Sequence, residues 1–418
     1  MLVIIILLGG VSPSVSAAEL TLNKAIKIAV QNNKDLQATR NVVDRANARL
    51  LQAGLPENPR LELGGSSGFL FNNAREYNTS VGFSQQFPIS GRIARQEDVA
   101  QVDVYMASAE VEVAERKLAR DTAATFYRLV ILNKQIQERD NLIIVDKNLV
   151  RLTLNRIKAA EVSELDLSTA HIELARLQQE RILLQSRQAR ERSILNKLLG
   201  KPAAQPLNLD DSLVRRQPLP ILSELQQQAL NLRPDLRVES LGMTRAHAAQ
   251  ELANAQSWED WTIGMRVEQS RLSITGAPRQ EAERIFGVSL SIPLPWRNKN
   301  QGRIAEAVVA GTQAQQRIEA LKFSISNEVA SSYDEIERLK KALQTYEHDI
   351  LPAADRNARL SQQAYGLGQI PIFSVVQAQR QHSDAHVAYF NTLDQYLQIL
   401  VILRYRTGNS LGKKELKP

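Results

Sequence analysis

The chain of 418 residues repeats one order of segments after 200 positions. Each copy begins with a short amphipathic segment, continues through two alternating segments and ends in a long helical run. The shared positions are Leu22, Ala25, Ala29, Asp35 and Leu36 in the first copy and Leu222, Leu225, Ala229, Asp235 and Leu236 in the second. A repeat of this length is too long for a solenoid unit and indicates a duplicated structural half. We expect the halves to span residues 19–208 and 209–408.

The helical run of each copy is unusually long. Residues 92–199 contain neither glycine nor proline, although average composition would place about a dozen there. In the second copy, apolar positions advance by a mean step of about 3.5 residues, which is the period of a coiled coil. These positions are Ile304, Val308, Gly311, Ala314, Ile318, Leu321, Ile325, Val329, Tyr333, Ile336, Leu339, Leu343, Tyr346 and Ile350.

Each helical run must turn back on itself, and local signals place the turns. Ser163 followed by Asp166 forms a capping-box pattern that starts a second helix and ends the first near Ala159. In the second copy Gly366 and Gly368 end one helix, and Pro371 suits the first turn of the next. The sequence therefore predicts two helical hairpins with tips at these positions.

Four segments between the helical parts alternate between apolar and small or polar residues. The apolar face holds Leu61, Leu63, Phe69, Phe71, Tyr77, Val81, Phe83, Phe87, Trp261, Ile263, Met265, Val267, Phe286, Val288, Leu290 and Ile292. Strands of this length with one apolar face match those of outer-membrane proteins, and they also match half-buried hairpins of soluble proteins. Four strands cannot close a barrel, and open edges are not viable in lipid. A membrane location therefore requires several copies to share one barrel.

Composition excludes several classes of function. The chain has no cysteine, which rules out disulfides, thiolate metal sites and a cysteine nucleophile. Its 52 basic residues are interleaved with 45 acidic ones, a pattern typical of solvated helix faces, so we expect no nucleic-acid partner. Residues 1–11 are apolar and 12–18 are mostly small, which predicts a cleaved signal peptide at 1–18. Residues 409–418 are expected to form a tail.

The order of strand pair, long hairpin, strand pair and long hairpin behind a signal peptide resembles the TolC-type outer-membrane efflux proteins. The resemblance covers the chain from about residue 20 to residue 408 and rests on segments 22–36, 222–236, 87–92 and 365–368. Segment 291–302 is similar to the branch that serves heavy-metal exporters of the cobalt-zinc-cadmium and copper-silver kind. The resemblance implies a mainly α-helical fold with a membrane β-barrel portion, completed as a trimeric α/β-barrel channel.

The resemblance also implies a function and partners. The protein would be the passive exit duct for heavy-metal cations in a tripartite efflux system, located in the outer membrane and extending into the periplasm. Its partners would be two further copies, outer-membrane lipid, a periplasmic adaptor and an inner-membrane pump of the resistance-nodulation-division class. No cofactor and no enzymatic activity are expected. Two alternatives remain, namely a duct for drugs or secreted polypeptides and a soluble periplasmic coiled-coil scaffold or adaptor.

The resemblance places functional residues at the hairpin tips. The pore gate would be formed by Asp166, Ser374 and Gln377, with Glu161 and Glu164 at the mouth. The family often has aspartates where this chain has Ser374 and Gln377, so its acidic ring would be sparser. Adaptor docking is expected at Lys158, Ala159, Ala160, Val162, Ser163, Gly366, Leu367, Gly368, Gln369, Ile370 and Pro371. Asp166 also has a plain structural role available, as the acidic residue of the helix's first turn.

Histidines offer one further candidate. His382 and His386 are four residues apart and so share a helix face, as metal ligands do. Two ligands at that spacing do not make a site, and we expect interhelical or surface histidines and no bound metal.

Overall fold

The computed structural model describes residues 19–68, 73–210, 219–271 and 281–409. The predicted signal peptide, Phe69, Phe71 and nearly all of the predicted tail lie outside these ranges. The described residues form two compact units, and each unit draws segments from both halves of the sequence. Within the described ranges, unit 1 contains residues 19–37, 114–210, 219–233 and 324–409, and unit 2 contains residues 38–68, 73–113, 234–271 and 281–323.

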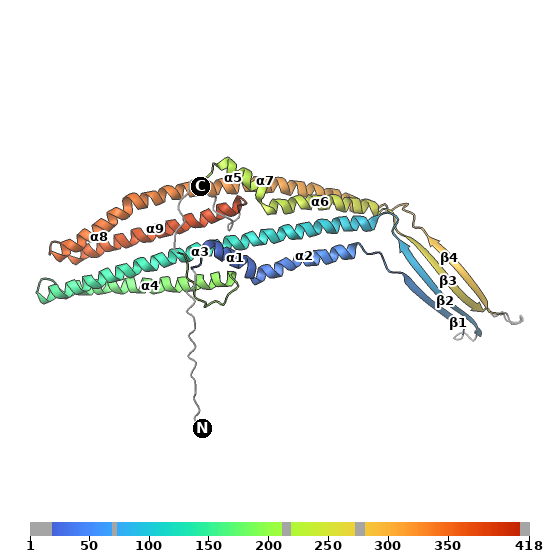
Figure 1. The fold of residues 1–418 in the computed structure, drawn as a ribbon, viewed down its shortest axis with the longest axis horizontal. Helices are drawn as coiled ribbons and strands as arrows, with labels where there is room; N and C mark the ends of the chain where they lie inside the picture. The colour runs from blue at the N-terminus through green and yellow to red at the C-terminus, as the bar shows by residue number, and fades with distance from the viewer. Residues whose placement is uncertain (1–18, 69–72, 211–218, 272–280, 410–418) are drawn as a thin grey trace, which may run out of the picture. The chain divides into compact units, whose positions relative to one another are not determined.

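The elements follow the predicted duplicated order (Figure 1). The first half contains α1 (Leu22–Asn32), α2 (Lys34–Ala53), β1 (Arg60–Gly68), β2 (Asn73–Phe87), α3 (Arg92–Lys158) and α4 (Glu164–Leu198). The second half contains α5 (Leu222–Leu232), α6 (Pro234–Ala255), β3 (Trp261–Arg271), β4 (Glu283–Ser291), α7 (Gln301–Thr345), the π-helix η2 (Tyr346–Ile350), α8 (Leu351–Gly366) and α9 (Ile372–Arg406). Helix α3 runs for 67 residues without a break, as expected from its lack of glycine and proline.

In unit 2 the four strands form one antiparallel sheet in the order β1-β2-β3-β4. The register places Leu61, Phe83, Met265 and Val288 in one row across the sheet and Leu63, Val81, Val267 and Phe286 in the next apolar row. Alternate rows between them carry small and polar residues, such as Glu62, Gly82, Arg266 and Gly287. The alternation predicted from the sequence is therefore in register across all four strands, although Ile292 lies just beyond β4.

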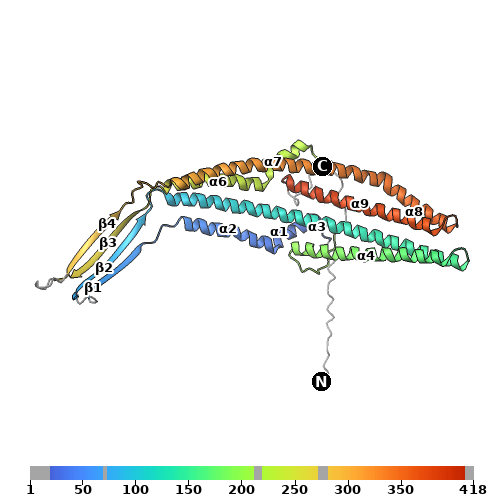
Figure 2. The same cartoon turned by 180° about the vertical axis from the view of Figure 1, so that it is seen from behind.

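In unit 1 helices from both halves pack together. Helices α8 and α9 lie side by side in Figures 1 and 2, and α4 also contacts α9. The end of each half is anchored in the same way, by a glycine with positive φ. A Cβ on Gly200 would lie 2.4 Å from the Asn32 carbonyl oxygen, and one on Gly408 would lie 2.4 Å from Leu232 Cβ. Since residues 32 and 232 end equivalent helices, this repeated close approach reflects the duplication directly.

The predicted coiled-coil stripe is largely buried, but its helix contains one π-helical turn between α7 and α8. Ala314, Ile318, Ile325, Val329, Ile336 and Leu343 are buried, whereas Val308 and Ile350 are 47% and 39% exposed. The π-helix η2 ends the regular pattern, and Leu351 N–H bonds the Tyr346 carbonyl five residues back. The expectation that Tyr346 and Ile350 continue one regular coiled-coil helix was therefore wrong. Pro352 lies in the first turn of α8, just after η2. Because proline has no backbone N–H to donate within a helix, it fits an irregular turn or the first turn of a new helix.

Candidate functional site

The two hairpin ends of unit 1 share one hydrophobic core. Leu149, Val150 and Ala170 from α3 and α4 pack with Tyr365, Ile372, Val375 and Val376 from α8 and α9. Leu167 and Ile370 add apolar surface at its edge. The fold thus holds the two predicted tips together, although they lie about 200 residues apart in the sequence.

Both tips use the same turn. Ala160 N–H bonds the Ile157 carbonyl and Glu161 N–H bonds the Arg156 carbonyl; at the other tip Gly368 bonds Tyr365 and Gln369 bonds Ala364. This pair of bonds is the Schellman ending of a helix, and it requires positive φ at its penultimate position. Ala160 has φ 56° and Gly368 has φ 74°. The first tip therefore places an alanine where the second has the glycine that the turn favours.

The second helix of each hairpin starts close to its predicted position. Ser163 is the N-cap of α4, as expected, but its side chain makes no capping hydrogen bond, so the predicted capping box does not form. Asp166 and Glu164 still lie in the first turn of α4, where acidic side chains oppose the helix dipole favourably. Pro371 is the N-cap of α9 and not a residue of its first turn.

The predicted gate and docking residues differ in accessibility. Gln377, Glu161 and Glu164 are exposed, while Asp166 and Ser374 are half-buried. The docking positions Lys158, Ala159, Ala160, Ser163, Gly366, Leu367, Gly368, Gln369 and Pro371 are exposed, and Val162 and Ile370 are half-buried. Leu165 and Phe373 flank the tips and are 74% and 70% exposed. Leu165 directly follows the predicted Glu164 and Phe373 directly precedes the predicted Ser374, but neither apolar side chain was predicted.

Arg156 is a second residue that sequence reasoning missed. It donates to the Tyr365 carbonyl at 2.8 Å and to the Glu161 carboxylate at 2.9 Å, and its guanidinium lies 4.7 Å from the centre of the Tyr365 ring. Tyr365 is fully buried, and its hydroxyl lies 3.1 Å from Thr153 Oγ1. Arg156 therefore fixes the two tips to each other. It also pairs with the charge of Glu161.

A buried ionic network continues behind the tips. Glu173 of α4 accepts hydrogen bonds from Arg176 and from Arg380 of α9, the latter at 2.9 Å. Burial alone would raise the pKa of Glu173, but the hydrogen bonds from the two arginines outweigh it and the pKa is lowered. Farther from the tips, burial lowers the pKa of Arg139, which contacts Glu180 at 3.2 Å and donates to Ser383 Oγ at 2.6 Å. Paired charges thus connect α3, α4 and α9.

The predicted histidine pair lies beside this network. His382 and His386 of α9 approach Glu138 of α3 and Asp355 of α8. Burial, and to a smaller extent the neighbouring His386, lowers the pKa of His382. The structure thus adds two carboxylates from other helices that spacing within α9 could not reveal.

The sheet of unit 2 has two faces of opposite character. Its apolar rows are exposed within the single chain: Leu63 is 73% exposed, and Phe286 and Val288 are each 65% exposed. The polar rows border a hollow of about 410 Å³ lined by Arg60, Glu62, Ser84, Thr262, Arg266 and Ser289 among others. Glu62 and Arg266 form an ion pair of 3.6 Å across it. A face this apolar and exposed requires a covering partner or lipid.

None of the helices within the described ranges is both long and apolar enough to span a lipid bilayer.

Two sequence comparisons match the chain along most of its length. The sequence family described as outer membrane efflux protein matches residues 25–201 and 225–409. The chain is 22% identical over 392 residues to the cobalt-zinc-cadmium resistance protein CzcC of Cupriavidus metallidurans, covering 93% of this chain and 90% of that protein.

Solved structures share the fold at low sequence identity. CusC has a TM-score of 0.74 at 17% identity, covering 94% of this chain and 93% of its own. The outer membrane protein VceC of Vibrio cholerae has a TM-score of 0.72 at 17% identity, covering 93% and 96%. The MtrE outer membrane channel of Neisseria gonorrhoeae has a TM-score of 0.72 at 19% identity, covering 93% and 89%. The predicted fold class is thereby confirmed.

Proposed function

Because the chain belongs to the outer membrane efflux protein family, we propose that three copies of it form a passive exit duct for heavy-metal cations. Family membership makes the protein an outer-membrane transport component that extends into the periplasm, and it excludes the soluble scaffold considered from sequence. The proposed cargo follows the similarity to the cobalt-zinc-cadmium resistance protein along 93% of the chain.

The main observation that supports a duct is that one face of the sheet is apolar and the other is polar. Each chain offers four strands whose apolar rows are exposed and whose polar rows border a hollow. Among the described residues β1 pairs only with β2, and β4 only with β3, so the sheet has two open edges. Such edges are costly in lipid unless neighbouring copies pair with them. Three sheets joined edge to edge would satisfy the edges, turn the apolar rows to lipid and enclose the polar rows.

The partners are proposed from the hairpin tips. Leu367 is a predicted docking position with an exposed side chain, and exposed Leu165 and Phe373 add apolar surface close to it in the two tips. We expect this surface to bind a periplasmic adaptor, which in turn would connect the duct to an inner-membrane pump of the resistance-nodulation-division class. The pump would supply the energy and select the cargo.

A deletion strain tests the cargo. Loss of the protein is expected to lower tolerance to zinc, cadmium or cobalt at least several-fold, and an intact copy should restore it. The matched comparison is tolerance to a panel of drugs in the same strain. Unchanged metal tolerance together with lost drug tolerance would replace the metal duct by a drug duct, and a defect in polypeptide export alone would indicate a secretion duct.

The proposed gate is tested in planar bilayers. A ring of Asp166 side chains from α4, together with Ser374 and Gln377 of α9, would attract cations at a narrow point. Asp166→Ala should weaken block of the channel by trivalent cations. Ser374→Asp adds three carboxylates per trimer and should strengthen the block. If neither substitution changes block or conductance, these positions do not form the gate.

A further inference from the structure

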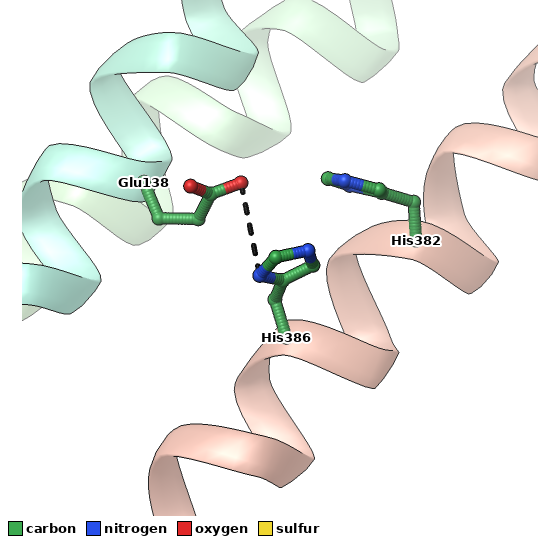
Figure 3. Close-up of side chains that lie close together, drawn as sticks. All are labelled: Glu138, His382 and His386. Carbon is green, nitrogen blue, oxygen red and sulfur yellow. Dashed lines mark ion pairs between the residues drawn. The ribbon is translucent and has the colours of Figure 1, made fainter. Parts of the chain in front are cut away.

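Three side chains from two helices converge in unit 1. Glu138 of α3 reaches toward His382 and His386, which project from successive turns of α9 (Figure 3). One candidate ligand atom from each residue lies within 4.8 Å of the others. The two imidazole rings are tilted against each other with their centres 4.4 Å apart.

Asp355 of α8 orients both imidazoles. Its Oδ1 atom lies 2.9 Å from His382 Nε2 and 3.1 Å from His386 Nε2. When both Nε2 atoms donate their protons to this carboxylate, the lone pairs of the neutral rings are on the Nδ1 atoms. A histidine that donates one ring N–H to a carboxylate and offers the other nitrogen is the usual arrangement around a bound metal.

The remaining nitrogens lack suitable partners. His382 Nδ1 is buried and makes no hydrogen bond. His386 Nδ1 lies 4.0 Å from Glu138 Oε1, so a lone pair and a carboxylate oxygen would face each other unless a proton or a cation lies between them. Histidines that merely hydrogen-bond Asp355 would explain the Nε2 atoms but not the Nδ1 atoms.

We propose that Glu138, His382 and His386 bind a divalent transition-metal ion of the zinc class, with Asp355 as a positioning residue. Two imidazoles and one carboxylate are a ligand set that suits Zn²⁺ or Co²⁺, and imidazole does not suit Ca²⁺ or Mg²⁺. Ligand atoms about 2.1 Å from a tetrahedral ion are about 3.4 Å apart. The candidate ligand atoms, now up to 4.8 Å apart, would therefore approach one another by up to about 1.4 Å through side-chain rotation. Three protein ligands leave a fourth position open to water, so the ion would exchange.

The surroundings leave the site accessible and its charges compensated. The side chains of His382 and His386 are 13% and 17% exposed, and that of Asp355 is 43% exposed. Glu138 and His386 also line a cavity of about 180 Å³. Arg139 lines the same cavity, but its charge is paired with Glu180. A bound ion would link α3 of the first half of the chain to α9 of the second half. Through Asp355 it would also be connected to α8 of the second half. This role does not depend on the cargo of the duct.

Titration of the detergent-solubilised full-length protein tests the site. The protein should carry no polyhistidine tag and should be stripped with a chelator before calorimetry with ZnCl₂ or CoCl₂. We expect one ion per chain, Co²⁺ absorption bands typical of four-coordination, and a higher apparent Tm with Zn²⁺. Glu138→Gln and His386→Ala should each weaken binding at least tenfold, and Asp355→Asn should weaken it tenfold to a hundredfold with stoichiometry unchanged.

Control variants separate the proposed site from adventitious binding. His171 lies on α4 and is exposed, so His171→Ala should bind Zn²⁺ as the unmodified protein does. Glu138→Gln preserves volume, and its elution and Tm in chelator report whether it folds. The proposal is overturned if the unmodified protein binds no Zn²⁺, or if folded Glu138→Gln and His386→Ala variants bind it with unchanged affinity. A histidine–carboxylate pair that only shares a proton would give the first of these results.

Discussion

Asp146 is a buried acidic residue of α3. It is 2% exposed, and burial, with a smaller contribution from Glu173, raises its pKa to about 7 against the opposing charge of Arg176. Its ordinary value is 3.8, so the folded protein binds a proton that the unfolded chain releases between these two values. The folded state therefore loses stability as pH rises from about 4 to 7 and changes little above that range.

Asp146→Asn should remove this loss. Each pH unit within the window corresponds to about 1.4 kcal/mol at most, so the variant should gain on the order of 2 kcal/mol relative to the unmodified protein between pH 5 and pH 7. The apparent Tm of both proteins in detergent at these two values checks the expectation. Asp349 is exposed, and Asp349→Asn serves as the control. An Asp146→Asn advantage that is equal at both pH values would show that Asp146 is ionised throughout.

The two hairpin tips have different residues at the position of the turn that needs positive φ. Ala160 and Gly368 occupy the same position of the same turn with positive φ. Ala160→Gly should stabilise the protein by about 0.5–1 kcal/mol, since glycine adopts this conformation without steric cost. Gly368→Ala should destabilise it by about 1–2 kcal/mol, and its new Cβ would also lie 3.3 Å from Arg156 Nη2. Thermal unfolding of both variants measures the difference, and shifts of the same sign would contradict the assignment of the turn.

At the level of elements, periodic signals predicted most of the fold. The run without glycine or proline predicted α3, and the period-two segments predicted all four strands with ends within one to a few residues of those observed. These predictions succeeded because each pattern depends on one element alone. The π-helix was missed although Pro352 marks its end, because the coiled-coil period was followed through the proline. The candidate site was harder to predict. Arg156 meets Tyr365 209 residues away, and no single-helix pattern sets the rotation of α3 against α8.

For the histidine pair too, the sequence predicted positions within one helix but not contacts between helices. Spacing within α9 placed His382 and His386 on one face, but the two carboxylates come from α3 and α8. Which residues of separate helices meet depends on the axial shift of one helix along another. A shift of one turn, about 5.4 Å, would remove Glu138 from the cluster. Both candidate sites therefore depend on contacts between helices, which periodicity within one helix does not predict.

For the whole molecule, the adjacent positions Val288 and Ser289 of β4 separate the two faces of the sheet. Val288 lies in an exposed apolar row and Ser289 in the adjacent polar row of the sheet. If the apolar rows face lipid in a shared barrel, Val288→Arg places a charge in the bilayer at a cost of about 2–4 kcal/mol near its middle. Ser289→Arg places the same charge toward water. We expect Val288→Arg to reduce the amount of protein in the outer membrane and its yield of crosslinked trimer, and Ser289→Arg to leave both largely unchanged. Equal behaviour of the two variants, or a greater loss with Ser289→Arg, would mean that the apolar rows are covered by protein, and the shared barrel would have to be abandoned.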